Sequence, residues 1–137
     1  MIEDVLIATQ DRLLELIPEN IAYVSEDWGQ LDYYNERPPV NFPCVLFDIE
    51  DAQFSDLTHN VQRGDAILTL RVAHFDPVNI SALAPNREKQ FRMFALLRMI
   101  YTRLQGLSGE SFSGLTRISL RRAKREDAIR EYIMQFR

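Results

Sequence analysis

The stretch Arg37 to Phe75, RPPVNFPCVLFDIEDAQFSDLTHNVQRGDAILTLRVAHF, decides the fold because it holds two strong strand signals. The first signal, Cys44 to Ile49, follows Pro43, whose missing N–H suits the first residue of a strand. In the second, Ala66 to Phe75, successive residues alternate between two faces, as they do in a half-buried strand. The pattern predicts a sheet, and no catalytic motif lies on it.

A long polar connection is expected between these two strands. The first strand should continue, less regularly, toward Phe54, and residues 58–65 should link it to the second strand. Gly64 is then expected to serve a turn or a bulge, where the absence of a Cβ is useful.

Amphipathic helices are expected on either side of this stretch. Ile2 to Ile17 and Glu88 to Leu107 both repeat large apolar residues at helical spacing, so each helix has one apolar face. Asn86 is expected to cap the second helix, and Gly106 or Gly109 to end it. A helix of this kind should lie across a sheet.

Three further segments complete the expected fold. Ile21 to Val24 is short but apolar enough for a strand, and Gly114 to Arg122 alternates like a half-buried strand. Ala128 to Phe136 is interpreted as the returning strand of a hairpin, although its apolar residues also fit helical spacing. Together these segments predict an α+β fold with a mainly antiparallel sheet of four to five strands and two helices, in the order α-β-β-β-α-β-β.

Composition predicts one ordinary domain over residues 1–137. The chain is 46% hydrophobic and 26% charged with few Gly and Pro residues, which is typical of a globular protein. Its single cysteine, Cys44, allows no internal disulfide, which fits a reducing compartment or a protein indifferent to redox conditions. No run approaches the roughly 18 apolar residues of a membrane span, and the acidic start is unlike a secretory signal, so a cytoplasmic protein is expected.

Residue types that carry catalysis are sparse. The sequence has no glycine-rich phosphate loop, no Gly-x-Ser-x-Gly elbow and no Cys or His cluster. A nucleophile pair of Cys44 and His74 is conceivable, but a cysteine within an apolar strand is more typical of inert core. Glu50, Asp51 and Asp56 lack the spacing of a calcium loop and are interpreted as a solvated strand end. We therefore expect no enzyme, no metal and no cofactor.

Two features favour contacts with a partner. Trp28, Tyr33 and Tyr34 lie in a polar loop, where they either cover the edge of the core, the favoured interpretation, or anchor another protein. Basic residues also cluster near the end of the chain, whereas most acidic residues precede Asp76. This basic cluster could be a solvated turn, a surface that meets a neighbour's acidic surface, or a phosphate site. Its members are Arg117, Arg121, Arg122, Lys124, Arg125 and Arg130. The net charge of −4 argues against nucleic-acid binding by the whole surface.

In element order and size, the chain resembles the tail-terminator, or tail-completion, proteins of long-tailed bacteriophages and prophages. The residues that carry the resemblance are PPVNFPCVLFDI (38–49), AILTLRVAHF (66–75) and EYIMQF (131–136). The resemblance implies a structural protein that forms a ring, usually a hexamer, at the end of the tail tube nearest the head. Such a ring stops tube polymerisation and joins the head, so the implied partners are tail-tube and head-tail connector proteins. The implied location is the cytoplasm during assembly and then the virion tail.

Loops between strands make the ring contacts in that family. By position, the resemblance gives this role to the aromatic loop and to the connection from Gln53 to Asp65, which contains Phe54 and Arg63. With the basic cluster, the candidate interface residues are Trp28, Tyr33, Tyr34, Phe54, Arg63, Arg121, Arg122 and Arg125. Alternative functions are a small nucleic-acid-binding module that uses the basic cluster, a non-catalytic protein-interaction domain, or an enzyme that uses Cys44.

Overall fold

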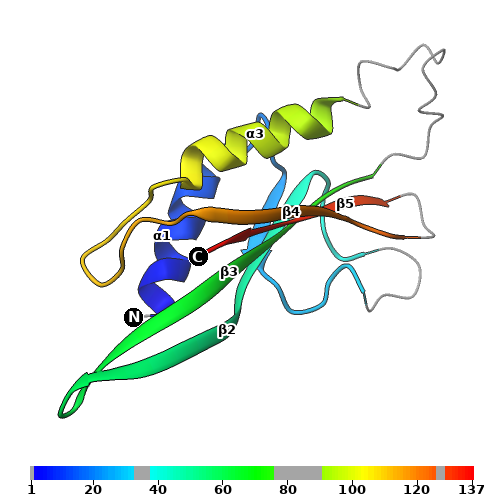
Figure 1. Cartoon of the computed structure of the whole chain (residues 1–137). Coiled ribbons are helices and arrows are strands. Elements are labelled where there is room, and N and C mark those ends of the chain that lie inside the picture. Colours follow the sequence, from blue (N-terminus) through cyan, green and yellow to red (C-terminus); the bar gives the residue numbers. More distant parts are fainter. Residues whose placement is uncertain (1, 33–37, 76–90, 126–128) are drawn as a thin grey trace.

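The protein has an α+β fold, which confirms the predicted class (Figure 1). A computed structural model describes residues 2–32, 38–75, 91–125 and 129–137. The helices and strands in chain order are α1 (Ile2–Leu14), β1 (Tyr23–Glu26), β2 (Cys44–Thr58), β3 (Val61–Phe75), α3 (Arg92–Leu104), β4 (Arg117–Ala123) and β5 (Ile129–Phe136).

Within the described residues, five strands form one sheet in the order β1-β2-β3-β5-β4. β1 runs parallel to β2, and the other neighbouring pairs are antiparallel. The last segment is therefore a strand rather than a helix, and it lies between β3 and β4. Its inner position is favourable because it can pair on both sides, with Leu70 and Leu120 both opposite Met134.

The main core lies between one face of the sheet and both helices. The alternate residues Leu68, Leu70 and Val72 of β3 are buried there, as the strand pattern predicts. From the helices, Leu13 and Ile100 are fully buried in the same cluster. Complete burial of each such side chain stabilises the fold by about 1.5–3 kcal/mol.

A smaller cluster covers part of the opposite face of the sheet. The loop between β1 and β2 supplies Leu31 and Val40, which pack on Cys44, Leu46 and the equally buried Ala73. The second face is therefore apolar only at the end of the sheet where β2 begins. The rest of that face is mostly polar, with Asp48, Thr69, Arg71, Glu131 and Gln135 on it.

The predicted ends of the helices need small corrections. α1 ends at Leu14 rather than at Ile17, and turns follow it. α3 ends at Leu104, and Gly106 then takes a left-handed conformation at φ 80°, which glycine adopts without steric cost. Asn86, the predicted cap, lies outside the described residues.

The prediction that β4 is half-buried is wrong. Ile118 and Leu120 are 45% and 43% exposed. β4 lies at one edge of the sheet, whereas the buried side chains of α3 pack in the cluster that contains Met134 and Phe136 of β5. Alternation identified the strand correctly, but it does not reveal whether another element covers that strand.

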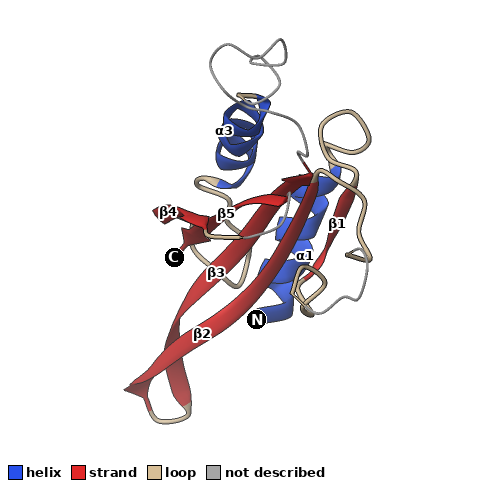
Figure 2. Ribbon diagram, turned by 90° about the vertical axis from the view of Figure 1, so that its right-hand side faces the viewer, coloured by secondary structure: helices blue, strands red, loops and turns tan. Residues whose placement is uncertain are grey.

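The largest correction concerns the predicted connection between the two long strands. Residues 58–65 are mostly strand rather than loop, because β2 continues to Thr58 and β3 begins at Val61. Only His59 and Asn60 separate the two strands, and Asn60 has a φ of 65°, which asparagine tolerates better than most residues. The two strands together make a long hairpin that projects from the body (Figures 1 and 2).

Candidate interaction surfaces

The projecting part of this hairpin, residues 50–66, is named the arm. It begins at an irregularity in the β2–β3 register between Ile49 and Asp51, where Glu50 is the extra residue. A bulge of this kind bends a strand and increases its twist, so it changes the direction of the hairpin where the hairpin leaves the body. Beyond it, residues 53–65 are all exposed. The arm is held together by the pairing of its own two strands rather than by contacts with the core.

Apolar side chains are displayed on the arm. Phe54, Leu57 and Val61 are 55%, 62% and 51% exposed. Isolated exposed apolar residues are common in monomers, but several on a projecting hairpin of two paired strands favour contact with another molecule. Phe54, a sequence-predicted interface residue, thus lies in the most exposed part of the described structure.

Gly64 is neither a turn residue nor part of a bulge, so that prediction is wrong. It lies in the β3 ladder directly opposite Phe54. A Cβ added at position 64 would lie 2.8 Å from Cε1 of the Phe54 ring. The aromatic ring lies across the backbone at this position, so a larger residue there would displace the exposed Phe54 ring.

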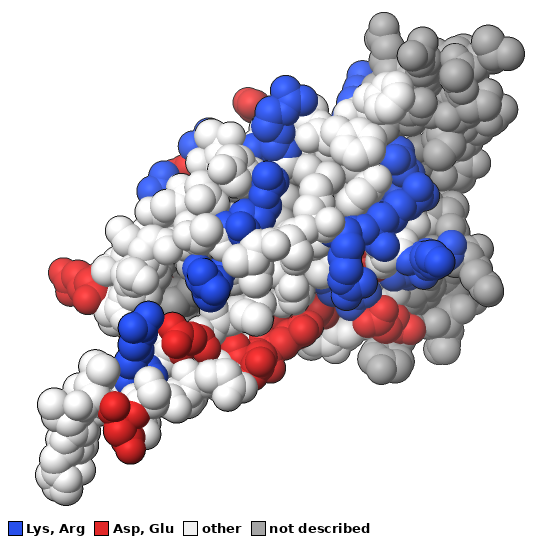
Figure 3. Space-filling model, viewed as in Figure 1, with Lys and Arg blue, Asp and Glu red and all other residues white. Residues whose placement is uncertain are grey.

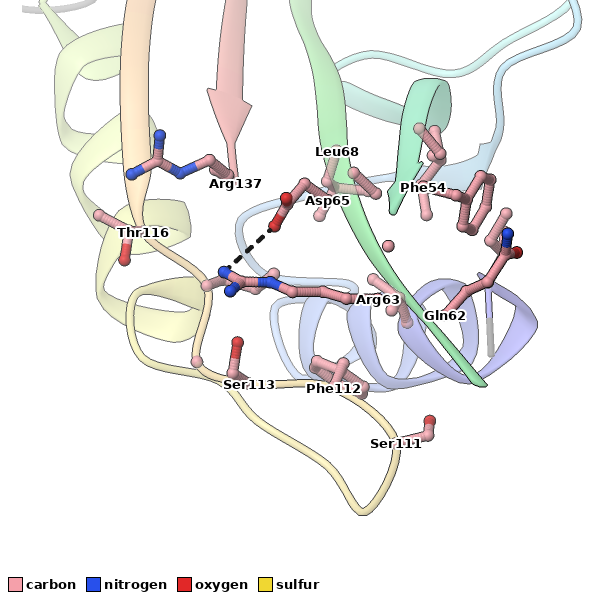
Figure 4. Close-up of a pocket in the computed structure, with 18 of the residues that line it drawn as sticks. Phe54, Gln62, Arg63, Asp65, Leu68, Ser111, Phe112, Ser113, Thr116 and Arg137 are labelled. Carbon is pink, nitrogen blue, oxygen red and sulfur yellow. Dashed lines mark ion pairs between the residues drawn. The ribbon is translucent and has the colours of Figure 1, made fainter. Parts of the chain in front are cut away.

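A hollow of about 540 Å³ lies where the arm meets the body (Figure 4). The arm supplies one wall with Phe54 and Arg63, and the loop before β4 supplies Ser111 and Phe112 opposite. Arg63 forms an ion pair with Asp65 at 3.6 Å, but both side chains are mostly exposed, so the pair contributes little to stability. The hollow is open and lacks a convergent set of buried polar groups.

On the opposite face of the sheet, Arg71 is the centre of an ion-pair network. Its Nε donates to Glu131 Oε2 at 2.7 Å, and its two Nη atoms donate to both carboxylate oxygens of Asp32 at 2.7 and 2.8 Å. These hydrogen bonds raise the pKa of Arg71, because Asp32 and Glu131 favour its charged form. Arg71 in turn lowers the pKa of Asp32, chiefly by hydrogen bonding. The network fastens the loop after β1 to the middle of the sheet.

Arg125 belongs to the same network. Its guanidinium donates to Glu131 Oε1 at 2.8 Å and to the Leu31 carbonyl at 2.7 Å. Glu131 is only 1% exposed and lies between Arg71 and Arg125, which neutralise its buried charge. The structure thus places Arg125, a predicted interface residue, in an internal structural role.

Trp28 does not cover the core edge, so the favoured interpretation for this residue is wrong. Its side chain is 63% exposed, and Leu31 covers the core instead. The loop around Trp28 is nevertheless well held, because its backbone N–H donates to the Oε1 of buried Gln30 at 2.8 Å and Gly29 N–H donates to Asp27. A fixed loop that displays an exposed tryptophan suits an anchor for a partner. Tyr33 and Tyr34 lie outside the described residues.

The remaining basic candidates lie on the edge strand. Arg121 and Arg122 of β4 are exposed, as is Lys124 just after it. No ion pair joins any of these three to another residue in the described part of the chain. Arg121 and Arg122 therefore remain available to a partner, unlike Arg125.

Cys44 and His74 are not brought together. Cys44 pairs with Ala73 in the register, so its side chain shares a face with Ala73, while His74 points to the other face. Burial raises the pKa of the Cys44 thiol to about 12, so almost none of it is the nucleophilic thiolate at neutral pH.

The described residues contain no group of three or more His, Cys, Asp or Glu residues arranged to hold a metal ion. Among the described helices, neither is long and apolar enough to cross a membrane. No protein-family model matches the chain, and no curated protein sequence matches it.

Proposed function

We propose that this protein is a structural tail protein of a phage or prophage, a ring-forming tail terminator that caps the tail tube and joins it to the head. The observation that carries the proposal is the arm, a long exposed hairpin with apolar side chains that add nothing to the protein's own core. Exposed apolar side chains on a projecting hairpin lower the solubility of a free monomer, whereas in an assembly a neighbouring molecule can bury them.

Other observations support a structural role. Arg71, Asp32, Glu131 and Arg125 are the most strongly interacting charged groups, and although they line an open hollow of about 510 Å³, their charges are paired with one another. Cys44, the strongest nucleophile in the sequence, is buried and protonated. The chemistry displayed on the surface is suited to protein contacts rather than to bond making.

The test is to interrupt the coding sequence in the phage or prophage that encodes it and to examine the particles by electron microscopy. A tail terminator's loss should give tubes of uncontrolled length without attached heads, and expression of the chain in trans should restore finished particles. Tails of normal length with heads attached would contradict the proposal, as would a source genome that produces no tail.

A small nucleic-acid-binding module is the second candidate, favoured by the unpaired basic residues of the edge strand. Arg121, Arg122 and Lys124 could contact phosphates. A titration of duplex DNA at rising salt measures this, because each phosphate contact steepens the salt dependence of the affinity. The tail-terminator proposal expects no specific affinity in that titration.

A further inference from the structure

An apolar strip with basic neighbours lies between α3 and the edge strand β4. Phe94 of α3 is exposed and packs edge-on against Tyr132, with 5.7 Å between ring centroids. One strand further out, Leu120 is exposed on the same face of the sheet as the core residue Met134, with which it pairs. Ile118, the unpaired residue at an irregularity in the β4–β5 register, is exposed two positions away on the same strand. These three exposed side chains, Phe94, Ile118 and Leu120, are named the edge strip.

In the described part of the chain, the charged side chains placed beside the edge strip are arginines. Arg122 lies on the same face, opposite Tyr132, while Arg121 projects from the other face of the same strand. At the other end of the strip, the guanidinium of Arg117 lies 4.1 Å from the centre of the Tyr101 ring. Between positions 117 and 125 the sequence has no acidic residue. Figure 3 shows Lys and Arg side chains gathered over α3 and β4.

The arm has the complementary composition. It displays Phe54, Leu57 and Val61, and its charged residues are Glu50, Asp51, Asp56 and Asp65 against the single Arg63. Asp51 and Asp56 are exposed, and their only side-chain hydrogen bonds among the described residues come from the neutral amides of Gln53 and Gln62. An apolar, acidic arm therefore faces solvent on the same molecule as an apolar, basic strip.

The arm cannot reach the basic end of the edge strip of its own chain. In the sheet register, Arg121 lies opposite Ile133, which lies opposite Arg71. The arm begins at Ala66, five residues back along β3, and runs away from that point (Figure 1). An interaction between the two surfaces must therefore join two molecules.

We propose that the arm of one copy docks along the edge strand β4 of a second copy. Asp56, on the same face of the arm as Phe54, then meets Arg122 beside the edge strip, and Asp51 meets Arg121 on the other face of the strand. The contact is head-to-tail, because the two surfaces differ, and repetition of such a contact closes a ring or extends a filament. The place of this contact in a tail ring rests on the proposed function, but the contact itself does not.

Charge reversal tests the inference. Asp51→Lys/Asp56→Lys reverses the arm, and Arg121→Glu/Arg122→Glu reverses the strip. Each variant alone should self-associate at least about 100-fold more weakly than the wild type in analytical ultracentrifugation, because like charges then meet. An equimolar mixture of the two should recover association, since each reversed surface finds its complement. All four residues are exposed, and circular dichroism verifies that the variants fold.

The matched control is Asp11→Lys/Arg12→Glu on α1, which changes the same types of exposed charge and should leave association unchanged. Each of three outcomes would overturn the inference. The arm variant could associate as strongly as the wild type, the mixture of variants could fail to recover association, or the wild type could stay monomeric at low salt. The tail phenotype remains a separate measurement. If disruption of the gene leaves the tails normal while the arm contact forms as expected, the proposed function alone is overturned. If disruption gives overlong tails while the arm variant associates like the wild type, this inference alone is overturned.

Discussion

At the scale of single residues, the structure depends on a charge that the sequence does not single out. Glu131 is almost fully buried between two arginines, and both hydrogen bond to it. Removal of one charge from a buried ion pair or network leaves the remaining charges without compensation. Glu131 therefore holds Arg71 and Arg125 together on the second face of the sheet.

Glu131→Gln should lower the free energy of unfolding by about 3 kcal/mol, which is at the lower end of the range for a broken buried ion pair. We expect the lower end because Asp32 still binds Arg71 in this variant. Urea denaturation measures the change. The matched variant Glu50→Gln, at an exposed position, should change stability by less than about 0.5 kcal/mol. Equal effects of the two substitutions would show that the network contributes nothing.

Asp32 should make stability depend on pH in a defined window. Its pKa is lowered from 3.8 by hydrogen bonds from Arg71, so the folded state binds a proton less readily than the unfolded state. The stabilisation is therefore fully present above pH 3.8 and is lost as the pH falls through the lowered pKa. Because Asp32 is 43% exposed, solvent screens it, and the contribution should stay below about 1 kcal/mol.

Urea unfolding of the wild type and Asp32→Asn across the acid range checks this. The difference between the two should be constant at neutral pH and should vanish at the lowest pH at which both proteins fold. A difference that grows as the pH falls has the opposite sign and would contradict the assignment.

Cys44 should be unreactive in the folded protein. Its pKa of about 12 and its complete burial leave neither thiolate nor access for a thiol reagent at neutral pH. Labelling with a chromogenic disulfide should occur only after unfolding, at a rate that increases with denaturant. Rapid labelling of the native protein would reopen the interpretation of Cys44 as a nucleophile.

At the scale of elements, the arm and the rest of the sheet have separable roles. β2 and β3 contribute to the core only through residues before Glu50 and after Ala66, and the arm contributes no residue to either buried cluster. A hairpin of two strands has little stability of its own. The arm therefore depends on the body for its position, while the body does not depend on the arm.

Replacement of residues 52–66 by Asn-Gly should leave a folded protein, because Asp51 and Ile67 are paired and a two-residue turn can join them. The free energy of unfolding should change by about 1 kcal/mol or less, since no buried residue is lost. Self-association should disappear. Thermal denaturation and sedimentation, measured on the same samples, separate the two effects, and global unfolding of the shortened chain would show that the arm is part of the core structure.

At the scale of the whole molecule, most of the acidic and basic side chains lie on different surfaces. Acidic residues lie on and beside the arm, and basic residues lie over α3 and β4 (Figure 3). With a net charge of only −4, long-range repulsion between copies is small and local complementarity can decide how they meet.

Self-association should therefore weaken as salt is added, since exposed charges are screened over about 10 Å at 0.1 M and about 3 Å at 1 M ionic strength. Sedimentation at these two salt concentrations measures the change. The contact should not vanish altogether, because burial of Phe54 and Leu57 against the edge strip is insensitive to screening. Stronger association at high salt would instead indicate a contact that is apolar alone.

The sequence by itself determined the elements of this protein and the residues of its main core. Periodicity depends on the geometry of one helix or one strand, so alternation in Ala66 to Phe75 and helical spacing in the segment containing Arg92 to Leu104 were sufficient. The same local logic found the strand Ile129–Phe136, although it left a helix open there. The types and positions of Phe54 and Arg122 also made them candidates for an interface, which stays a prediction.

Only the tertiary structure decided which of these residues face solvent and which face each other. Residues 50–66 are polar and irregular in pattern because neither face of the arm is buried, so their sequence resembles a loop even though the strands pair. Arg125 and Arg122 are three positions apart, yet one is tied to Glu131 and the other is exposed, because pairing of β4 with β5 sets their surroundings. Local sequence encodes conformation, whereas burial and charge pairing depend on residues that are distant in the chain.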